Sequence, residues 1–142
     1  MHSLVQALTN YNTTFHLVAP TELKLPSSVK QYIKDANLEY HQYDDMDEVI
    51  SKVDVLYMTR IQQERFSDPL EYERVKNVYI LKNEMLENSK RNLRVMHPLP
   101  RVNEITEDVD SNPKAYYFQQ AKNGVYVRQA LLSLILNVQP EI

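Results

Sequence analysis

The stretch DDMDEVISKVDVLYMTRIQQERF (residues 44–66) places a helical pattern directly before a continuous apolar run. Residues 44–53 carry acidic side chains at their amino-terminal end, where a helix dipole favours negative charge, and Lys52 lies near the other end. Residues 54–59 (DVLYMT) are typical of a strand that is buried on both faces. The stretch therefore predicts a helix over 44–53 that leads into a buried strand over 54–59.

The same alternation of helix and strand patterns continues on both sides of this stretch. Asp68 and Pro69 are typical of an N-cap and a first helical position, and the last helical pattern is interrupted near Asn123 and Gly124. Helices are predicted over 2–11, from Pro26 onward, over 67–76, over 84–90 and over about 115–138. Strands are predicted over 15–20, 38–43, 78–81 and 93–98. Strands separated by helices indicate an α/β fold, a doubly wound parallel sheet flanked by helices, or Rossmann-like fold.

Composition narrows the class of protein. A chain of 142 residues with 43% hydrophobic and 25% charged residues fits a single soluble domain. The net charge of −3 argues against nucleic acid as a partner, and the most apolar segment, 130–138, is too short to span a membrane. The absence of cysteine excludes disulfides and cysteine-ligated metals. We therefore expect a cytoplasmic protein without contact to nucleic acid or membrane.

Glycine is nearly absent from the sequence. Gly124 is the single glycine of the chain. Glycine-rich phosphate-binding loops, including the dinucleotide-binding and P-loop patterns, are therefore excluded. A phosphate group would have to be held by side chains, by helix amino termini or by a part of the protein outside this sequence.

Two predicted strands end in loops with unusual chemistry. The strand over 54–59 is followed by RIQQERF (60–66), and the strand over 93–98 runs into HPLPRVNEI (97–105). Ligands of parallel α/β sheets bind at the carboxyl ends of the strands. Both loops are therefore expected on the same edge of the sheet.

The first loop offers groups that suit a small anion. Arg60 and Gln62 are two positions apart, so in extended backbone their side chains point the same way. A guanidinium pairs bidentately with a carboxylate, and an amide adds a donor and an acceptor. The alternative is a solvated charged loop, in which Arg60 and Arg65 pair with Glu64 or nearby acids.

The second loop is stiffened by Pro98 and Pro100 on either side of Leu99. Proline fixes φ and disfavours helical backbone in the residue before it. The carbonyl groups of this loop are therefore not engaged in the hydrogen bonds of a helix. Those carbonyls can accept hydrogen bonds from an amide or amine of a ligand. The alternative is a rigid exit from the strand, and His97 alone is more often a packed histidine than a base or ligand.

Three blocks of the sequence resemble successive signatures of the aspartate carbamoyltransferase family. They are VLYMTRIQQERF (55–66), MHPLPRVNEI (96–105) and AYYFQQAKNGVYVRQALLSLIL (115–136), in family order and at family spacing. The related ornithine carbamoyltransferases differ by an HCLP loop with a cysteine, whereas TRIQ is the aspartate-type loop. The resemblance implies synthesis of N-carbamoyl-L-aspartate and phosphate from carbamoyl phosphate and L-aspartate in pyrimidine biosynthesis, without metal or organic cofactor.

The resemblance also implies roles for individual residues. Arg60 binds an aspartate carboxylate, and Gln62 contacts aspartate through its side chain. The carbonyl groups of Pro98 and Leu99 hold the amide end of carbamoyl phosphate and receive the aspartate amine. The family has a cis bond at the position of Leu99–Pro100. Domain-bridging or supporting roles are implied for Glu64, Arg65, Pro100 and Arg101.

The resemblance covers only the carboxyl-terminal, aspartate-binding half of the family chain. Met1 stands where the family has a Gly-Arg-Thr stretch that ends a strand, so residues 1–142 are expected to form the aspartate-binding domain without its first strand. The helix at about 125–138 is apolar nearly all round and is expected to pack towards the amino-terminal carbamoyl phosphate domain, on a missing segment or a separate chain. We expect a homotrimer in the intact enzyme.

No catalytic residue is assigned to this chain alone, because the implied active site is incomplete. We therefore expect no catalysis without the other half. The alternative is a non-catalytic, transferase-like module that binds dicarboxylates or serves assembly.

Overall fold

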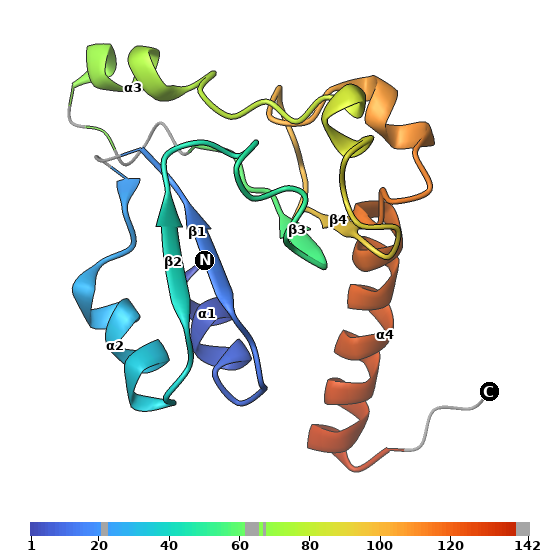
Figure 1. Cartoon of the computed structure of the whole chain (residues 1–142). Coiled ribbons are helices and arrows are strands. Elements are labelled where there is room, and N and C mark those ends of the chain that lie inside the picture. Colours follow the sequence, from blue (N-terminus) through green and yellow to red (C-terminus); the bar gives the residue numbers. More distant parts are fainter. Residues whose placement is uncertain (21–22, 62–65, 67, 139–142) are drawn as a thin grey trace. The chain divides into compact units, whose positions relative to one another are not determined.

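The computed structural model describes residues 1–20, 23–61, 66 and 68–138. The chain divides into two compact units, Met1–Val53 and Asp54–Ile142, and each is described by itself. Figure 1 labels the helices and strands of both units. Among the described residues, no helix is long and apolar enough to cross a membrane.

The first unit is a parallel pair of strands covered by two helices. It contains α1 (His2–Leu8), β1 (Phe15–Val18), α2 (Ser27–Asp35) and β2 (Tyr40–Tyr43). The register places Phe15 opposite Tyr40 and Val18 opposite Tyr43. Val29 and Ile33, one helical turn apart on α2, pack with Val5 of α1 and Phe15 of β1 to form the core. The four elements confirm the helices and strands predicted up to residue 43.

The predicted helix over 44–53 is wrong. The segment forms successive turns, in which the backbone N–H groups of Val49 and Ile50 both donate to the carbonyl oxygen of Met46. The Asp45 carboxylate accepts the N–H of Asp47, so a side chain competes with the helical hydrogen bonds at the start of the segment. Met46, Val49 and Ile50 are nevertheless buried, as the i, i+3, i+4 spacing requires.

The second unit is built around another parallel pair of strands. Its elements are β3 (Val55–Tyr57), α3 (Pro69–Val75), η3 (Asn83–Leu86), β4 (Arg94–Met96), η4 (Glu107–Ser111) and α4 (Tyr117–Leu136). Leu56 of β3 lies opposite Val95 of β4, and both are buried. At the start of α3, the Asp68 carboxylate accepts the N–H of Leu70 and Pro69 follows it, which confirms the predicted cap.

The described strands form two parallel two-stranded ladders, β1–β2 and β3–β4, which confirms a parallel α/β fold. The predicted strand over 78–81 is reduced to an isolated bridge between Leu81 and Ile105. Val78 is 48% exposed, so only the end of that apolar run is covered. The predicted helix over 84–90 is a short 3₁₀ turn that begins at Asn83.

The last helix, α4, runs without interruption through Asn123 and Gly124, contrary to the prediction. Gln119 donates to the Asn123 side chain at 2.7 Å, and the Arg128 side chain donates to the Gly124 carbonyl at 3.0 Å. These contacts span one helical turn and support the helix across its weakest position. The helix ends at Asn137, which adopts left-handed backbone with φ 51°.

Replacing Ile33 by alanine should destabilise the first unit, because Ile33 is fully buried in its core. We expect Ile33→Ala to lower the free energy of unfolding by about 2–5 kcal/mol. Urea denaturation followed by circular dichroism measures this change. Lys34→Ala, at the exposed neighbouring position of the same helix, should change it by less than about 0.5 kcal/mol. Equal losses for the two variants would contradict the assignment of this core.

Candidate functional site

The pairing of β3 with β4 determines where the candidate site lies. Tyr57 lies opposite Met96 at the carboxyl ends of the two parallel strands, and the N–H of Met58 donates to the Met96 carbonyl at 2.8 Å. The chain continues from these ends into Arg60 and into the proline loop, defined here as residues 97–101. The structure therefore brings Arg60, at the start of the first predicted loop, and the proline loop to one edge of the ladder.

The proline loop is anchored by its first residue and open in its middle. His97 is 1% exposed, and its backbone N–H donates to the side-chain oxygen of Gln120 on α4 at 3.0 Å. The Leu99–Pro100 bond is cis, as the family resemblance implied. Among the described residues, none donates a hydrogen bond to the carbonyl oxygen of Pro98 or Leu99. Binding of a ligand by these two carbonyl groups stays a prediction.

Behind the loop lies a buried pair that the sequence analysis did not single out as a pair. His97 Nε2 lies 2.7 Å from Glu104 Oε1, and Glu104 is 5% exposed. Burial raises the pKa of Glu104, but hydrogen bonds from backbone N–H groups, including that of Val102, and from His97 lower it by more. The pKa of Glu104 is therefore lowered overall, and the carboxylate is ionised at neutral pH. The prediction that His97 is a packed histidine is confirmed.

Arg101, at the end of the loop, is held by a cluster within the second unit. Its guanidinium donates two hydrogen bonds to the Asp110 carboxylate, of which Nη2–Oδ2 measures 2.7 Å, and lies 5.7 Å from the Tyr117 ring centroid. The Tyr117 hydroxyl donates to the same carboxylate. The Arg101 hydrogen bonds lower the pKa of Asp110, and burial with the Asp110 hydrogen bond raises the pKa of Tyr117 to about 12. This cluster ties the loop to α4.

Arg60 lines a small pocket next to the segment that follows the proline loop. The pocket, of about 60 Å³, is also lined by Tyr72, Lys76, Asn103 and Glu104. Lys76 pairs with Glu73, whose carboxylate oxygen lies 2.6 Å from the lysine Nζ, and the Glu73 hydrogen bond raises the pKa of Lys76. Arg60 itself is exposed. The lining of this pocket thus combines a guanidinium, an ammonium and a phenol with the Glu104 carboxylate.

Three of the predicted site residues, Gln62, Glu64 and Arg65, lie outside the described residues. Their roles stay predictions.

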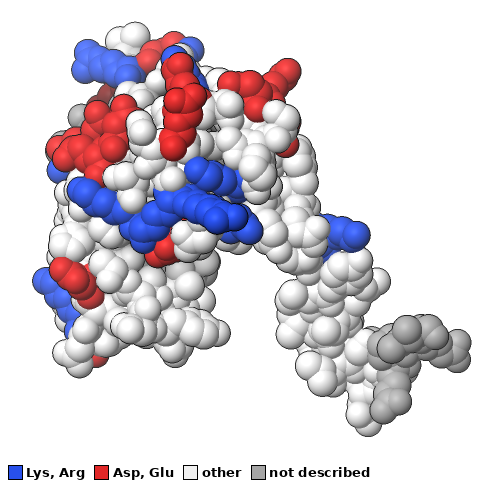
Figure 2. Space-filling model, turned by 45° about the vertical axis from the view of Figure 1, so that its right-hand side comes forward, with Lys and Arg blue, Asp and Glu red and all other residues white. Residues whose placement is uncertain are grey.

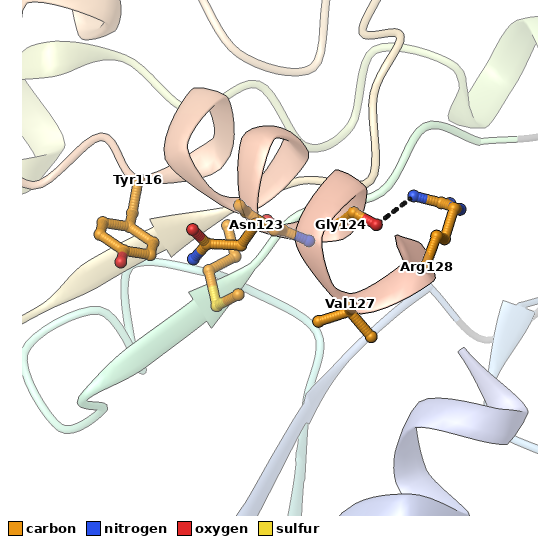
Figure 3. A pocket seen from close by; sticks show the side chains of 7 residues that line it. Tyr116, Asn123, Gly124, Val127 and Arg128 are labelled. Carbon is orange, nitrogen blue, oxygen red and sulfur yellow. Dashed lines mark hydrogen bonds between the residues drawn. The ribbon is translucent and has the colours of Figure 1, made fainter. Parts of the chain in front are cut away.

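A larger hollow of about 460 Å³ lies between the end of β4 and α4. Figure 3 shows Tyr116, Asn123, Gly124, Val127 and Arg128 around it, with the Arg128 side chain bonded to the Gly124 carbonyl. A Cβ atom at position 124 would lie 2.8 Å from Arg128 Nη1, so this close approach requires glycine or a shifted arginine. Gln120 also lines the hollow and holds the His97 backbone. This hollow was not predicted from sequence, because it forms only where Met96 at the end of β4 comes next to α4 and the residue before it.

Comparison with known proteins identifies the relatives of this chain. The family model described as "Aspartate/ornithine carbamoyltransferase, Asp/Orn binding domain" matches residues 1–135. The aspartate carbamoyltransferase catalytic subunit of Bacteroides fragilis is 59% identical over 139 residues, which are 97% of this chain and 45% of that protein. The catalytic subunit from Vibrio campbellii is 53% identical over 138 residues, 96% of this chain and 44% of that protein.

Solved structures of aspartate transcarbamoylases also superpose on this chain. The catalytic subunit of M. jannaschii aspartate transcarbamoylase superposes with a TM-score of 0.86 at 44% identity, over 96% of this chain and 45% of that one. Aspartate transcarbamoylase from Trypanosoma cruzi, in complex with carbamoyl phosphate and aspartate, gives a TM-score of 0.83 at 34% identity, over 92% of this chain and 44% of that one. The chain thus spans about half the length of the relatives it matches.

The Arg101–Asp110–Tyr117 cluster should make the free energy of unfolding depend on pH in the alkaline range, where Tyr117 loses its proton. Folding raises the pKa of Tyr117 from 10.0 to about 12. The contribution of the protonated Tyr117 side chain to the free energy of unfolding is therefore complete below about pH 10 and is lost as the pH rises towards 12. At about pH 8 we expect the free energy of unfolding of the wild type to exceed that of Tyr117→Phe by on the order of 2 kcal/mol. This difference should become smaller by about pH 11.5. Urea denaturation across this range measures it.

Tyr11→Phe is the matched control, because Tyr11 is 68% exposed. A difference between wild type and Tyr117→Phe that stays constant across the pH range would contradict the prediction.

Proposed function

The chain belongs to the aspartate/ornithine carbamoyltransferase family, and on this premise we propose that it is the aspartate-binding part of an aspartate carbamoyltransferase. That enzyme makes N-carbamoyl-L-aspartate and phosphate from carbamoyl phosphate and L-aspartate, in pyrimidine biosynthesis. The observation that carries the proposal is that Arg60 and the proline loop follow strands whose carboxyl ends lie side by side in the β3–β4 ladder. Arg60 also shares a pocket with the segment that follows the proline loop. The relatives named above are aspartate carbamoyltransferases, which favours aspartate over ornithine.

In the proposed arrangement, each group acts by position and charge. Arg60 binds a carboxylate of aspartate through the planar fork of its guanidinium, and Gln62 adds an amide contact. The carbonyls of Pro98 and Leu99 accept hydrogen bonds from the amide of carbamoyl phosphate and from the attacking amine. The amine attacks the carbonyl carbon, phosphate leaves, and the amine loses a proton. Catalysis of this kind rests on holding the two reactants in line.

The remaining predicted residues have proposed supporting roles. Glu64 and Arg65 form ion pairs towards the other domain of the enzyme. Pro100 and Arg101 hold the end of the proline loop, and the Arg101–Asp110 pair supports this role.

An apolar surface on α4 suggests where the rest of the enzyme binds. The carboxyl-terminal half of α4 carries no charged side chain after Arg128, and it is largely white in Figure 2. Large apolar side chains there are more than half exposed: Val125, Tyr126, Val127, Leu131, Leu132, Leu134, Ile135 and Leu136. A patch of this kind marks an interface. We propose that it packs against a carbamoyl phosphate domain, in the half of the enzyme that this chain does not match.

The proposed whole enzyme is a cytoplasmic homotrimer of the complete catalytic unit. The second candidate is a dicarboxylate-binding or assembly module without turnover, and the experiment below separates the two.

Complementation tests the proposed function. This chain is mixed with the part of the Bacteroides fragilis subunit that precedes the matched region, and carbamoyl aspartate is measured by a colorimetric assay. We expect turnover from the mixture and none from either part alone. Arg60→Ala should raise the KM for aspartate about 10- to 100-fold, because a charged hydrogen bond is worth about 1.5–3 kcal/mol.

Two variants control this experiment. Arg60→Lys keeps the charge but lacks the planar fork, so it should recover only part of the affinity. Arg91→Ala removes an equal charge from an exposed position ahead of β4, and it should leave the KM unchanged. Aspartate binding without turnover in the mixture would favour the binding module. An unchanged KM in Arg60→Ala would overturn the assignment of Arg60.

The α4 surface gives a separate prediction. Leu131→Asp combined with Ile135→Asp should weaken association of the two parts at least about 100-fold, because two buried charges would be left without partners. Size-exclusion chromatography and calorimetry measure the association. Leu70→Asp introduces the same charge at an apolar side chain that is 65% exposed on α3, outside the α4 surface, and it should leave the affinity within about threefold of wild type. Undiminished association in the double variant would show that α4 does not form this interface.

A further inference from the structure

We propose that His97 and Glu104 are positioning residues, which together aim the carbonyl groups of Pro98 and Leu99 at the reacting groups. This inference rests on the proposed function and adds to it two residues that do not touch substrate. It starts from the buried contact between the two side chains, 2.7 Å between His97 Nε2 and Glu104 Oε1.

The hydrogen bonds of His97 determine its tautomer. The backbone N–H of Leu99 lies 2.9 Å from His97 Nδ1. A backbone N–H can only donate, so Nδ1 must present its lone pair. The ring proton therefore sits on Nε2, where it is donated to Glu104 Oε1. His97 is thus a neutral imidazole that accepts from the proline loop on one side and donates to a carboxylate on the other.

Glu104 completes the link on the far side of the loop. Its second carboxylate oxygen accepts the backbone N–H groups of Val102 and Asn103, each at 3.1 Å. The two side chains therefore connect backbone N–H groups at residues 99, 102 and 103, on both sides of Pro100. Both side chains are almost fully buried, at 1% and 5% exposure, where hydrogen bonds are stronger than in water.

The pair itself is fixed to the rest of the second unit. The N–H of Leu81 donates to the Glu104 carbonyl at 2.9 Å, and the N–H of Thr106 donates to the Leu81 carbonyl at 3.0 Å. Gln120 of α4 accepts the N–H of His97. The backbone at both ends of the loop is thus held by neighbouring elements, while Pro98 and Pro100 between them are exposed. Loss of the pair would free the carbonyl groups to rotate away without unfolding the ladder.

The test uses the complemented enzyme, with carbamoyl phosphate and L-aspartate as substrates. His97→Phe fills the space but neither accepts from Leu99 nor donates to Glu104. We expect kcat to fall on the order of 100-fold, as for a misplacement of about 1 Å, while the KM for aspartate changes less than about threefold. A merely structural role would lower the melting temperature without this split between kcat and KM.

A conservative variant should restore part of the rate. In His97→Asn, the side-chain oxygen can replace Nδ1 as the acceptor for the Leu99 N–H, so kcat should recover at least about tenfold over His97→Phe. His41→Phe is the matched control, because His41 forms a similar pair with Glu39, at 2.9 Å, but on the surface. That variant should leave kcat unchanged.

A second variant covers the case in which His97→Phe does not fold. Glu104→Gln keeps the size of the side chain but replaces one acceptor oxygen by a donor group. It therefore loses either the contact with His97 or the two contacts with the backbone N–H groups of Val102 and Asn103. We expect kcat to fall about tenfold or more. Unchanged kcat in whichever of these two variants folds would overturn the positioning role.

The chain alone supplies an independent readout. Nitrogen-15 NMR of histidine-labelled chain should show His97 protonated at Nε2, and the Leu99 amide should exchange more slowly in wild type than in His97→Phe. A proton on Nδ1 or equal exchange would overturn the inference. A mixture without turnover would overturn the proposed function and the catalytic role with it, whereas an active mixture with unimpaired His97→Phe would overturn the positioning role alone.

Discussion

The parallel pairing of β3 with β4 is the constraint on which the candidate site depends. Because the strands run the same way and Tyr57 lies opposite Met96, the loops that follow them emerge at one edge. Arg60, more than thirty residues earlier in sequence, shares a pocket with Val102–Glu104, the segment that follows the proline loop. A slip of one residue would turn every side chain of the ladder to the other face and bury the wrong groups.

Local chemistry allowed much of the fold to be predicted from sequence. The cap at Asp68, the helix with Val29 and Ile33, and the parallel strands follow from capping, spacing and alternation, which act over a few residues. The errors arose where side chains or tertiary contacts compete with local preference. Asp45 diverts the backbone over 44–53 into turns, and contacts across one turn carry α4 through Gly124.

The site was predictable in part for the same reason. Arg60 and the proline loop were recognisable because a guanidinium after a buried strand and prolines around one leucine are unusual in sequence. The His97–Glu104 pair was not, since it depends on a loop that folds back so that residues seven apart meet in the interior. Asp110 and Tyr117 likewise reach Arg101 only through the path of η4 and α4.

The exposed edge that carries Arg60 and the apolar half of α4 are linked by the exclusion of water. A single guanidinium such as Arg60, open to water, binds a carboxylate weakly, because solvent screens the charge and competes for the hydrogen bonds. The same contact becomes strong when a second surface excludes water from it. Burial of the apolar residues of α4 favours the binding of such a second surface, because the free energy gained is proportional to the apolar area removed from water. In the proposed enzyme, binding of the second half and tight binding of aspartate are therefore coupled, and each should strengthen the other.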